Sequence, residues 1–326
     1  MAEKVTSTQV AERAGVSRSA VSRVFTPGAS ASAATVEKVK AAAEELGYRP
    51  NVIARSLLTG RSRMIGLVAT YLDNLFYPGL IEELSTALQA EGYHILMFMA
   101  GPGARDVDDV VDAILDYQVG GLVLASVMLS SDLAERCRDM GVPVVLLNRR
   151  QGEPDEVAVV SDNMAGGRLA AEHLVSQGAR RIGHIAGWET ASTQREREAG
   201  LLAGLRDAGL GLYAREVGNF NAVDARKAAL AMFSEPEGRP DAVFVANDFM
   251  ALIVIDTLRH ELGIDVPGDV RIVGFDDVPA AAWMPYGLTT VRQDASAMVA
   301  QTVDLLLGRA ESAMMLPVEL IHRQTS

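Results

Sequence analysis

The chain has 326 residues, a formal net charge of −12 and a composition that is 49% hydrophobic and 22% charged, which corresponds to roughly two globular domains and excludes a disordered, collagen-like or coiled-coil chain. No apolar run reaches the roughly 18 residues that cross a bilayer, and the N-terminus has no apolar signal-like stretch, so we expect a cytoplasmic protein without membrane contact. The single cysteine, Cys137, can form no intramolecular disulfide and is expected to fill the core.

The charge is distributed unevenly along the chain. Residues 1–63 hold ten Lys and Arg against five Asp and Glu, a balance of +5, whereas residues 64–326 carry −17. A small basic module joined to a large acidic one predicts that polyanion binding belongs to the first 63 residues.

The first fifty residues predict three helices. Residues 6–9 have the capping-box spacing that begins a helix, and Gly15 permits a sharp turn after it. Ser17 can cap a second helix, and Ser32 can cap a third that Gly47 ends. Two short helices joined by a turn that contains glycine make a helix-turn-helix.

The second helix of such a unit lies in the major groove of DNA, with its N-terminal side chains at base edges. Arginine can pair with guanine through two hydrogen bonds, serine can bond several base edges, and hydroxyls at helix starts can bind phosphate. The alternative is a structural three-helix domain with a solvated arginine face. A further segment, 52–58, is too short to be stable alone and is expected to fold only against a partner. The predicted base-reading residues are Arg18, Ser19, Ser22 and Arg23, with Thr6 and Ser17 at phosphates.

Beyond residue 63 the pattern changes to alternating strands and helices. Strands this apolar, separated by helix-length segments, predict parallel sheets covered on both faces, and their number predicts two α/β subdomains. Ligands of such sheets bind at the carboxyl ends of the strands, which form a cleft between two facing sheets. The predicted strands cover 64–69, 95–98, 121–125, 142–147, 157–160, 182–186, 242–246 and 270–274.

Polar side chains follow several of these strands. Carboxylates, amides and a guanidinium in one cleft suit the vicinal hydroxyls of a sugar or the edge of a nucleobase. Helix capping is the alternative for each of them, and it is the favoured prediction for Asp248 and Asp277. Two aromatic residues, Trp188 and Phe220, can stack on a ligand or belong to the core. The polar candidates are Tyr71, Asp73, Asn74, Asn148, Arg195, Arg197, Asn247, Asp248, Asp276 and Asp277.

Catalysis finds little support in the sequence. The five histidines are scattered without metal-binding spacing, and no nucleophile elbow, phosphate-binding loop or dinucleotide-binding fingerprint occurs. The acidic cluster at 106–112 is interpreted as a solvated helix face. The sequence therefore predicts no catalytic residues, no metal and no cofactor.

Several motifs resemble the lactose/galactose repressor (LacI/GalR) family. VAERAGVS (10–17), VSRV (21–24), ELGYRPN (45–51) and ARSL (54–57) are similar to its headpiece and hinge. PVV (143–145), VAND (245–248), VGFDD (273–277) and LTTV (288–291) are similar to its core motifs, in the same order. The resemblance covers essentially the whole chain. A solute-binding or sugar-modifying protein, by contrast, would explain only the core.

The resemblance implies a homodimeric transcription regulator that binds a palindromic DNA operator and a small-molecule effector. The implied fold is α/β: a three-helix headpiece (1–50), a hinge helix (51–61), and a two-lobed core (62–326) like that of periplasmic sugar-binding proteins, with two parallel-sheet subdomains. Crossovers are expected near 161, 291 and 320. The N-subdomain would then comprise 62–161 and 292–319, and the C-subdomain 162–291 and 320–326.

The family's residue roles are carried over position by position. Arg18, Ser19 and Arg23 match base-reading positions, and Leu57 matches the hinge leucine that enters the minor groove. In the same hinge, small Ala54 permits close approach, Arg55 is expected at phosphate, and Asn51 opens the segment. Asn148 stands where aspartate is frequent, and Ala295 stands where some members have an aromatic residue. A sugar effector is favoured over a nucleobase or another metabolite, and loss of effector binding stays open. Arg197, Asn247 and Asp276 match effector-contacting positions of the family, and Phe220, also expected at the effector, matches a position that is often aromatic.

Overall fold

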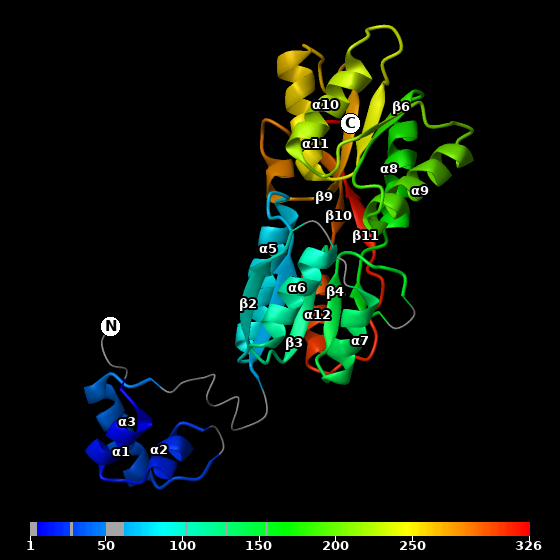
Figure 1. Cartoon of the computed structure of the whole chain (residues 1–326). Helices are drawn as coiled ribbons and strands as arrows, with labels where there is room; N and C mark the ends of the chain where they lie inside the picture. The colour runs from blue at the N-terminus through cyan, green and yellow to red at the C-terminus, as the bar shows by residue number, and fades with distance from the viewer. Residues whose placement is uncertain (1–4, 27–28, 50–61, 102–103, 128–129, 154–155) are drawn as a thin grey trace. The chain divides into compact units, whose positions relative to one another are not determined.

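The structure is a computed structural model that describes residues 5–26, 29–49, 62–101, 104–127, 130–153 and 156–326 (Figure 1). The chain divides into two compact units, Met1–Ser62 and Arg63–Ser326, which we call the headpiece and the core. Within the described ranges, no helix is both long enough and apolar enough to cross a membrane.

The described residues of the headpiece form the helices α1 (Ser7–Ala14), α2 (Arg18–Val24) and α3 (Ala33–Leu46). Thr6 and Gln9 form the complete capping box at the start of α1, and Gly15 ends this helix at φ 66°. The Ser17 and Ser32 side chains accept hydrogen bonds at the starts of α2 and α3. The predicted helix starts are therefore confirmed. The buried side chains that hold the three helices together are Val10, Ala11, Val21, Val39, Ala42 and Ala43.

The first lobe of the core is a sheet of five parallel strands in the order β2-β1-β3-β4-β5. Its strands are β1 (Met64–Ala69), β2 (His94–Met99), β3 (Gly121–Ala125), β4 (Val144–Leu147) and β5 (Ala158–Val159). Its helices are α5 (Phe76–Ala90), α6 (Ala104–Leu115), α7 (Ser131–Asp139) and, from late in the chain, α12 (Ala295–Leu306).

Alternate residues of these strands face opposite layers. Leu67 belongs to the apolar cluster that includes α5 and α12, and its neighbour Val68 belongs to the cluster that includes α6 and α7. Cys137 is fully buried in the second of these clusters. Because both faces of the central strands β1 and β3 are covered, these strands are apolar throughout, and this is the pattern that made them recognisable in the sequence.

The second lobe is a sheet of six strands in the order β11-β10-β9-β8-β6-β7, parallel except for β11. Its strands are β6 (Ile182–Ala186), β7 (Ala214–Val217), β8 (Ala242–Val245), β9 (Arg271–Asp276), β10 (Thr289–Gln293) and β11 (Val318–Ile321). Its helices are α8 (Asn163–Ser176), α9 (Ser192–Asp207), α10 (Ala222–Phe233), α11 (Asp248–Asp256), a π-helical turn (Thr257–Glu261) and a 3₁₀ turn (Pro279–Ala282).

All eight predicted strands are present, but β7, β10 and β11 were not predicted. β7 and β11 lie at the two edges of the second sheet, and each is a short strand that contains charged residues and has no fully buried residue. β10 is central but polar, because Thr289 and Thr290 bury hydroxyl groups that are hydrogen-bonded to other segments. Apolar runs alone therefore could not reveal these three strands.

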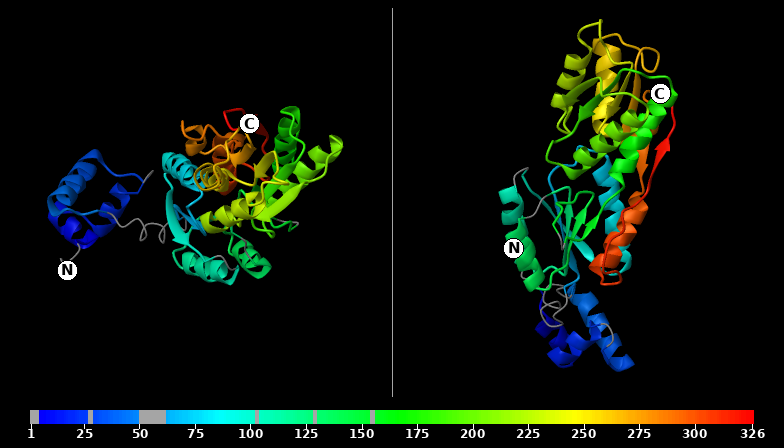
Figure 2. Two further views of the ribbon diagram at one scale, coloured as in Figure 1. Left: turned by 90° about the horizontal axis from the view of Figure 1, so that it is seen from above. Right: turned by 90° about the vertical axis from the view of Figure 1, so that its right-hand side faces the viewer.

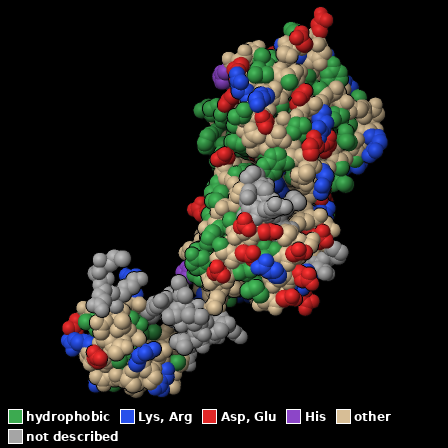
Figure 3. Space-filling model, in the orientation of Figure 1, with side chains coloured by type: hydrophobic (Ala, Val, Ile, Leu, Met, Phe, Trp, Pro, Cys, Tyr) green, Lys and Arg blue, Asp and Glu red, His purple; other side chains and the backbone are tan. Residues whose placement is uncertain are grey.

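The chain passes between the lobes three times, between β5 and α8, between β10 and α12, and between α12 and β11 (Figures 1 and 2). A single bridge between Ser161 and Leu316 joins two of these crossing segments. Residues 292–293 and 318–319, which the sequence placed in the first subdomain, lie in strands of the second sheet. Figure 3 shows Asp and Glu side chains scattered over both lobes, in keeping with the net negative charge of this part of the chain.

Candidate functional site

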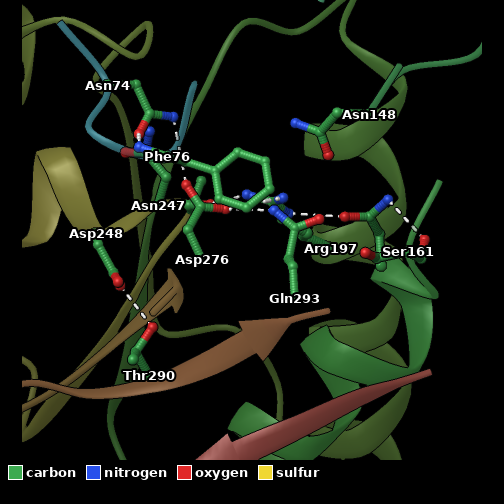
Figure 4. A network of polar contacts seen from close by, with 12 residues as sticks. Asn74, Phe76, Asn148, Ser161, Arg197, Asn247, Asp248, Asp276, Thr290 and Gln293 are labelled. Carbon is green, nitrogen blue, oxygen red and sulfur yellow. Dashed lines mark hydrogen bonds and ion pairs between the residues drawn. The ribbon is translucent and has the colours of Figure 1, made fainter. Parts of the chain in front are cut away.

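Segments that follow strands of both lobes bring buried polar side chains together inside the core (Figure 4). From the first lobe come Asn74, which follows β1, and Asn148, which follows β4. From the second lobe come Arg197 on α9 and Asp276 at the end of β9. This is the edge at which parallel sheets bind ligands.

Arg197 and Asp276 form a buried ion pair at the centre of this network. The Arg197 side chain is 3% exposed, and its Nη2 lies 3.4 Å from Asp276 Oδ1. It also donates from Nη1 to the Ala246 carbonyl at 2.6 Å and from Nε to Asn163 Oδ1 at 2.9 Å. Its guanidinium carbon lies 3.6 Å from the ring centre of Phe275. Burial lowers the pKa of Arg197 and raises that of Asp276, while the opposite charge of each partner acts against these shifts.

Asp276 also connects the two lobes. Asn74 Nδ2 of the first lobe donates to Asp276 Oδ2 at 3.3 Å, and Gln293 Nε2 donates to Oδ1 at 2.8 Å. The Asp276 carboxylate thus accepts hydrogen bonds from Asn74, Arg197 and Gln293, and these bonds link the two lobes and the end of β10. Asp276 is therefore a point of contact between the two lobes within this network.

A second group of side chains surrounds Arg149, which directly follows Asn148. Arg149 donates to the Ser126 carbonyl at 3.1 Å and to the Tyr71 hydroxyl at 3.0 Å, both in the first lobe. Its guanidinium carbon lies 5.1 Å from the ring of Trp188 and 5.6 Å from the ring of Phe220, both in the second lobe.

Two further features shape this group. Asn148 Nδ2 donates to the Tyr77 hydroxyl at 2.8 Å, and that hydroxyl is also hydrogen-bonded to Ser126 Oγ. Phe220 lies directly on the backbone of Gly187, where a β-carbon would be 2.0 Å from the ring. Only glycine therefore allows the aromatic ring to approach there.

Six buried side-chain atoms of the described residues have no hydrogen-bond partner in the protein. Such atoms are rare in folded proteins, because an unpaired buried polar group costs about 1–3 kcal/mol. They include both donors and acceptors, so a ligand rich in hydroxyl groups can satisfy them. They are Thr70 Oγ1, Asn148 Oδ1, Arg149 Nε, Ser161 Oγ, Asn247 Nδ2 and Gln293 Oε1.

Most effector candidates named from the sequence meet in this region. Asp73 is different: its side chain is exposed and is not part of the network. Arg195 is exposed as well, two positions before the buried Arg197. The candidates that lie in or against the network are Tyr71, Asn74, Asn148, Arg197, Phe220, Asn247 and Asp276.

The capping prediction for Asp248 and Asp277 is wrong. Asn247 caps α11 instead, through Oδ1 and the Met250 N–H at 3.0 Å. Asp248 is fully buried and accepts from the Thr290 hydroxyl at 2.5 Å and from a backbone N–H at 2.9 Å. Asp277 forms ion pairs with Arg292 and Arg323, each at 2.6 Å. The partners of both carboxylates lie at least 15 positions away, where local capping rules do not reach.

Several residues of the site were not found from the sequence. Arg149 could have been noticed because it directly follows Asn148 at the end of β4. Gln293 was hidden because the strand that carries it was not recognised. Tyr77, Ser126 and Asn163 are single polar residues within helix or turn segments and give no signal of their own.

The headpiece presents its predicted DNA-reading side chains to solvent. Arg18, Ser19, Ser22 and Arg23 are exposed along α2. Thr6 and Ser17 cap α1 and α2, so their hydroxyls are engaged with backbone N–H groups. The remaining hinge predictions lie outside the described residues: Asn51, Ala54, Arg55 and Leu57.

Among the residues that the structure describes, no cluster of three or more His, Cys, Asp or Glu side chains is arranged to hold a metal ion. The site is instead made of amides, hydroxyls, two guanidinium groups and one central carboxylate. This combination suits reversible binding of a polar ligand.

Known proteins resemble this chain over nearly its whole length. The ribose operon repressor of Bacillus subtilis (strain 168) is 32% identical, with 97% of each chain covered. The transcriptional regulator CelR of Thermobifida fusca is 34% identical over 96% of this chain and 94% of its own. A crystal structure of the Lac repressor dimer bound to operator and the anti-inducer ONPF matches with a TM-score of 0.88 at 30% identity, covering 99% of both chains.

A CelR–cellobiose complex matches with a TM-score of 0.72 at 30% identity, covering 99% of this chain and 100% of its own. Residues 171–326 match the profile of periplasmic binding protein-like domains. Residues 8–51 match the profile of bacterial regulatory proteins of the lacI family. The exposed arginines of α2, the two-lobed core and these similarities agree, and the chain belongs to the LacI family of DNA-binding transcriptional regulators.

Proposed function

We propose that this protein is a repressor of a sugar-metabolism operon, and that a small-molecule effector bound between the lobes of the core controls it. The observation that carries this proposal is the buried polar network between two lobes, with donors and acceptors that no residue of the described chain satisfies. Relatives support it by name, among them the ribose operon repressor and the CelR–cellobiose complex. A regulator of this kind acts in the cytoplasm and carries out no catalysis.

In this proposal the headpiece reads a palindromic operator, and the protein binds this operator as a homodimer. The similar Lac repressor structure is likewise a dimer bound to operator. Arg18, Ser19 and Arg23 read base edges, with Ser22 beside them. Asn51, Ala54 and Arg55 form the hinge at the DNA, and Leu57 opens a central base step in the minor groove. Thr6 and Ser17 lie at phosphates, where helix N-termini favour anions.

The effector in this proposal bridges the lobes. Arg197 and Asp276 bind its hydroxyl groups from the second lobe, and Asn74 and Asn148 bind them from the first. Asn247, Tyr71 and Phe220 complete the site, and Asp73 lies at its exposed rim. A ligand can shift the balance between two lobe arrangements only by binding them unequally, and such a shift would change the spacing of the two headpieces in a dimer.

A nucleobase that acts as corepressor is the second candidate effector class. The observation in its favour is that two site amides, Asn148 and Asn247, each keep one buried atom without a partner. An amide can meet the edge of a base through paired hydrogen bonds. A sugar is favoured because a carboxylate and a guanidinium together suit vicinal hydroxyls.

The experiment is a two-step binding assay with the full chain. Operators are first selected from a randomised DNA library, and the fluorescence anisotropy of the bound DNA is then followed while sugars and purines are added one at a time. We expect a palindromic site, and we expect its affinity to change about tenfold or more with one ligand class. Selection of no sequence would contradict the DNA-reading role, and tighter operator binding with purines alone would establish the second candidate.

A further inference from the structure

Arg149 is a buried cation without an acidic partner among the described residues. Arg149 is only 8% exposed. Its guanidinium donates to two neutral acceptors, the Ser126 carbonyl and the Tyr71 hydroxyl. Burial raises the pKa of Tyr71, so its phenol stays neutral and supplies no negative charge. An uncompensated buried charge is unfavourable, which makes it unusual outside functional sites.

Two other arginines near the lobe boundary, unlike Arg149, each form an ion pair with a carboxylate. Arg197 pairs with Asp276, and Arg150, the next residue after Arg149, pairs with Glu196 at 2.6 Å. The carboxylate of Asp276 is already surrounded by donors from Arg197, Asn74 and Gln293. Arg149, by contrast, forms no ion pair with a carboxylate of the described residues.

Arg149 also keeps one N–H donor without an acceptor in the described chain. The rings of Trp188 and Phe220 approach the guanidinium at 5.1 and 5.6 Å and belong to the second lobe, so Arg149 lies at the boundary between the lobes. Its Nε is buried and has no acceptor in the described chain. A planar guanidinium with a free N–H beside its terminal nitrogens matches the two oxygens of a carboxylate or phosphate.

We propose that the effector carries an anionic group, a carboxylate or a phosphate, which pairs with Arg149, in addition to hydroxyl groups that bind the Asp276 network. The ligand class is thus a sugar acid or a sugar phosphate rather than a neutral sugar. This inference rests on the proposed function of the site between the lobes. It adds a specificity-determining residue that lies next to Asn148, the position where the related family frequently has a carboxylate and this chain has a neutral amide.

The neutral side chain of Asn148 bears on the charge balance around Arg149. Asn148 is a neutral amide that donates to the Tyr77 hydroxyl, so it supplies no negative charge to the Arg149 guanidinium. With asparagine at position 148, the positive charge is left for the ligand to neutralise. The anionic group of the effector supplies the negative charge that the Asn148 side chain does not carry.

The test uses pairs of ligands that differ only in charge: glucose with gluconate and glucose 6-phosphate, and ribose with ribonate and ribose 5-phosphate. Inorganic phosphate is the minimal anionic probe, with sodium chloride at equal ionic strength as its reference. The melting temperature of the full chain is measured with each, followed by calorimetry on any ligand that raises it. The carboxylate and phosphate members of each pair distinguish the two possible anionic groups.

We expect an anionic member, and not its neutral parent, to raise the melting temperature of the wild type, and we expect Arg149→Met to weaken its binding at least tenfold. Arg150→Met is the matched control, since it removes the adjacent, already paired arginine, and it should retain the response. Arg149→Lys keeps the charge without the fork of donors, so it should keep the preference for the anion at reduced affinity. It also serves as the second variant where Arg149→Met does not fold.

Three results would overturn the inference. One is a neutral sugar that binds as tightly as its anionic counterpart, and another is anion binding that Arg149→Met leaves unchanged. The third is that the melting temperatures of wild type and Arg149→Met respond identically to every ligand tested, including inorganic phosphate. Each of these leaves the DNA-binding function intact, because operator selection measures that function separately, whereas failure of operator selection would leave the anion preference unaffected.

Discussion

Gly167 of α8 lies so close to the carbonyl group of Arg197 on α9 that a β-carbon at position 167 would be 2.0 Å from the carbonyl oxygen. The reciprocal contact is equally close, since a β-carbon at Gly200 would lie 2.0 Å from the carbonyl oxygen of Met164. The two helices therefore cross with their backbones in contact. This crossing sets the position of Arg197 against Asn163, which lies at the start of α8.

The first prediction concerns this helix crossing. Gly200→Ala introduces a methyl group where backbone atoms must move apart, so it should lower the free energy of unfolding by about 1–3 kcal/mol and weaken effector binding. Gly79→Ala in α5 is the matched control, because nothing lies within 4 Å of its β-carbon position. The control should raise stability by roughly 0.5–1 kcal/mol, since alanine favours the helix more than glycine does. Urea denaturation measures both, and equal stability of the two variants would contradict the proposed crossing.

The second prediction concerns the buried pair of Arg197 and Asp276. Arg197→Met leaves a buried carboxylate without its cation and should cost about 3–5 kcal/mol of stability, and Asp276→Asn should also be destabilising. The double variant removes both charges, so it should be more stable than the sum of the two single losses predicts, by about 1–3 kcal/mol.

A matched double-mutant cycle on the exposed pair of Arg168 and Asp207 provides the control for this prediction. Their side chains are 46% and 54% exposed, so the coupling should be below about 1 kcal/mol. Equal coupling in both cycles would show that burial does not strengthen the pair in the core.

The third prediction concerns pH and His184. This side chain is fully buried, its Nδ1 lies 2.9 Å from the Phe244 carbonyl, and burial lowers its pKa to about 4. In the unfolded chain the imidazole takes up a proton near its ordinary pKa of about 6.5, so acid favours unfolding between these two values. The stability from His184 is complete above about pH 6.5 and falls by about 3 kcal/mol as the pH approaches 4.

His184→Gln should therefore be less sensitive to pH than the wild type in this window, although less stable at neutral pH. Buried Asp276 and Asp248 have raised pKa values and act in the opposite direction, so only the difference between variant and wild type isolates the histidine. His260→Gln, at an exposed position, is the control and should follow the wild-type curve. Thermal unfolding across pH 4–7 is the measurement, and parallel curves for His184→Gln and wild type would contradict this assignment.

The fourth prediction concerns DNA reading by α2. Arg23→Ala should cost about 1–3 kcal/mol against the preferred operator and relax specificity at one position of each half-site, because a base-reading arginine distinguishes guanine from other bases. Arg13→Ala is the control in the same unit, because Arg13 forms an ion pair with Glu45 at 2.7 Å. It should leave the order of preference among sequences unchanged. Binding that weakens equally on all sequences in Arg23→Ala would assign this arginine to phosphate.

Local sequence patterns determined the headpiece. Thr6, Ser17 and Ser32 begin helices through bonds to residues three positions away, so the signal and its partner lie within one turn of chain. The apolar strands of the core were predictable for a similar reason, since burial on both faces marks every residue of a strand. The edge strands β7 and β11 were not predicted because none of their residues is fully buried and charged residues interrupt their apolar runs.

The sequence alone determined that the chain joins a basic helical reader of DNA to an α/β core with polar groups after its strands, because capping and burial leave their marks on neighbouring residues. Only the tertiary structure decided which polar groups meet. Asn74 bonds Asp276 across 202 positions, and Arg149 contacts aromatic rings of the other lobe but no acidic side chain of the described residues. Such pairings depend on how two sheets present their strand ends to one another, and no periodicity along the chain records that arrangement.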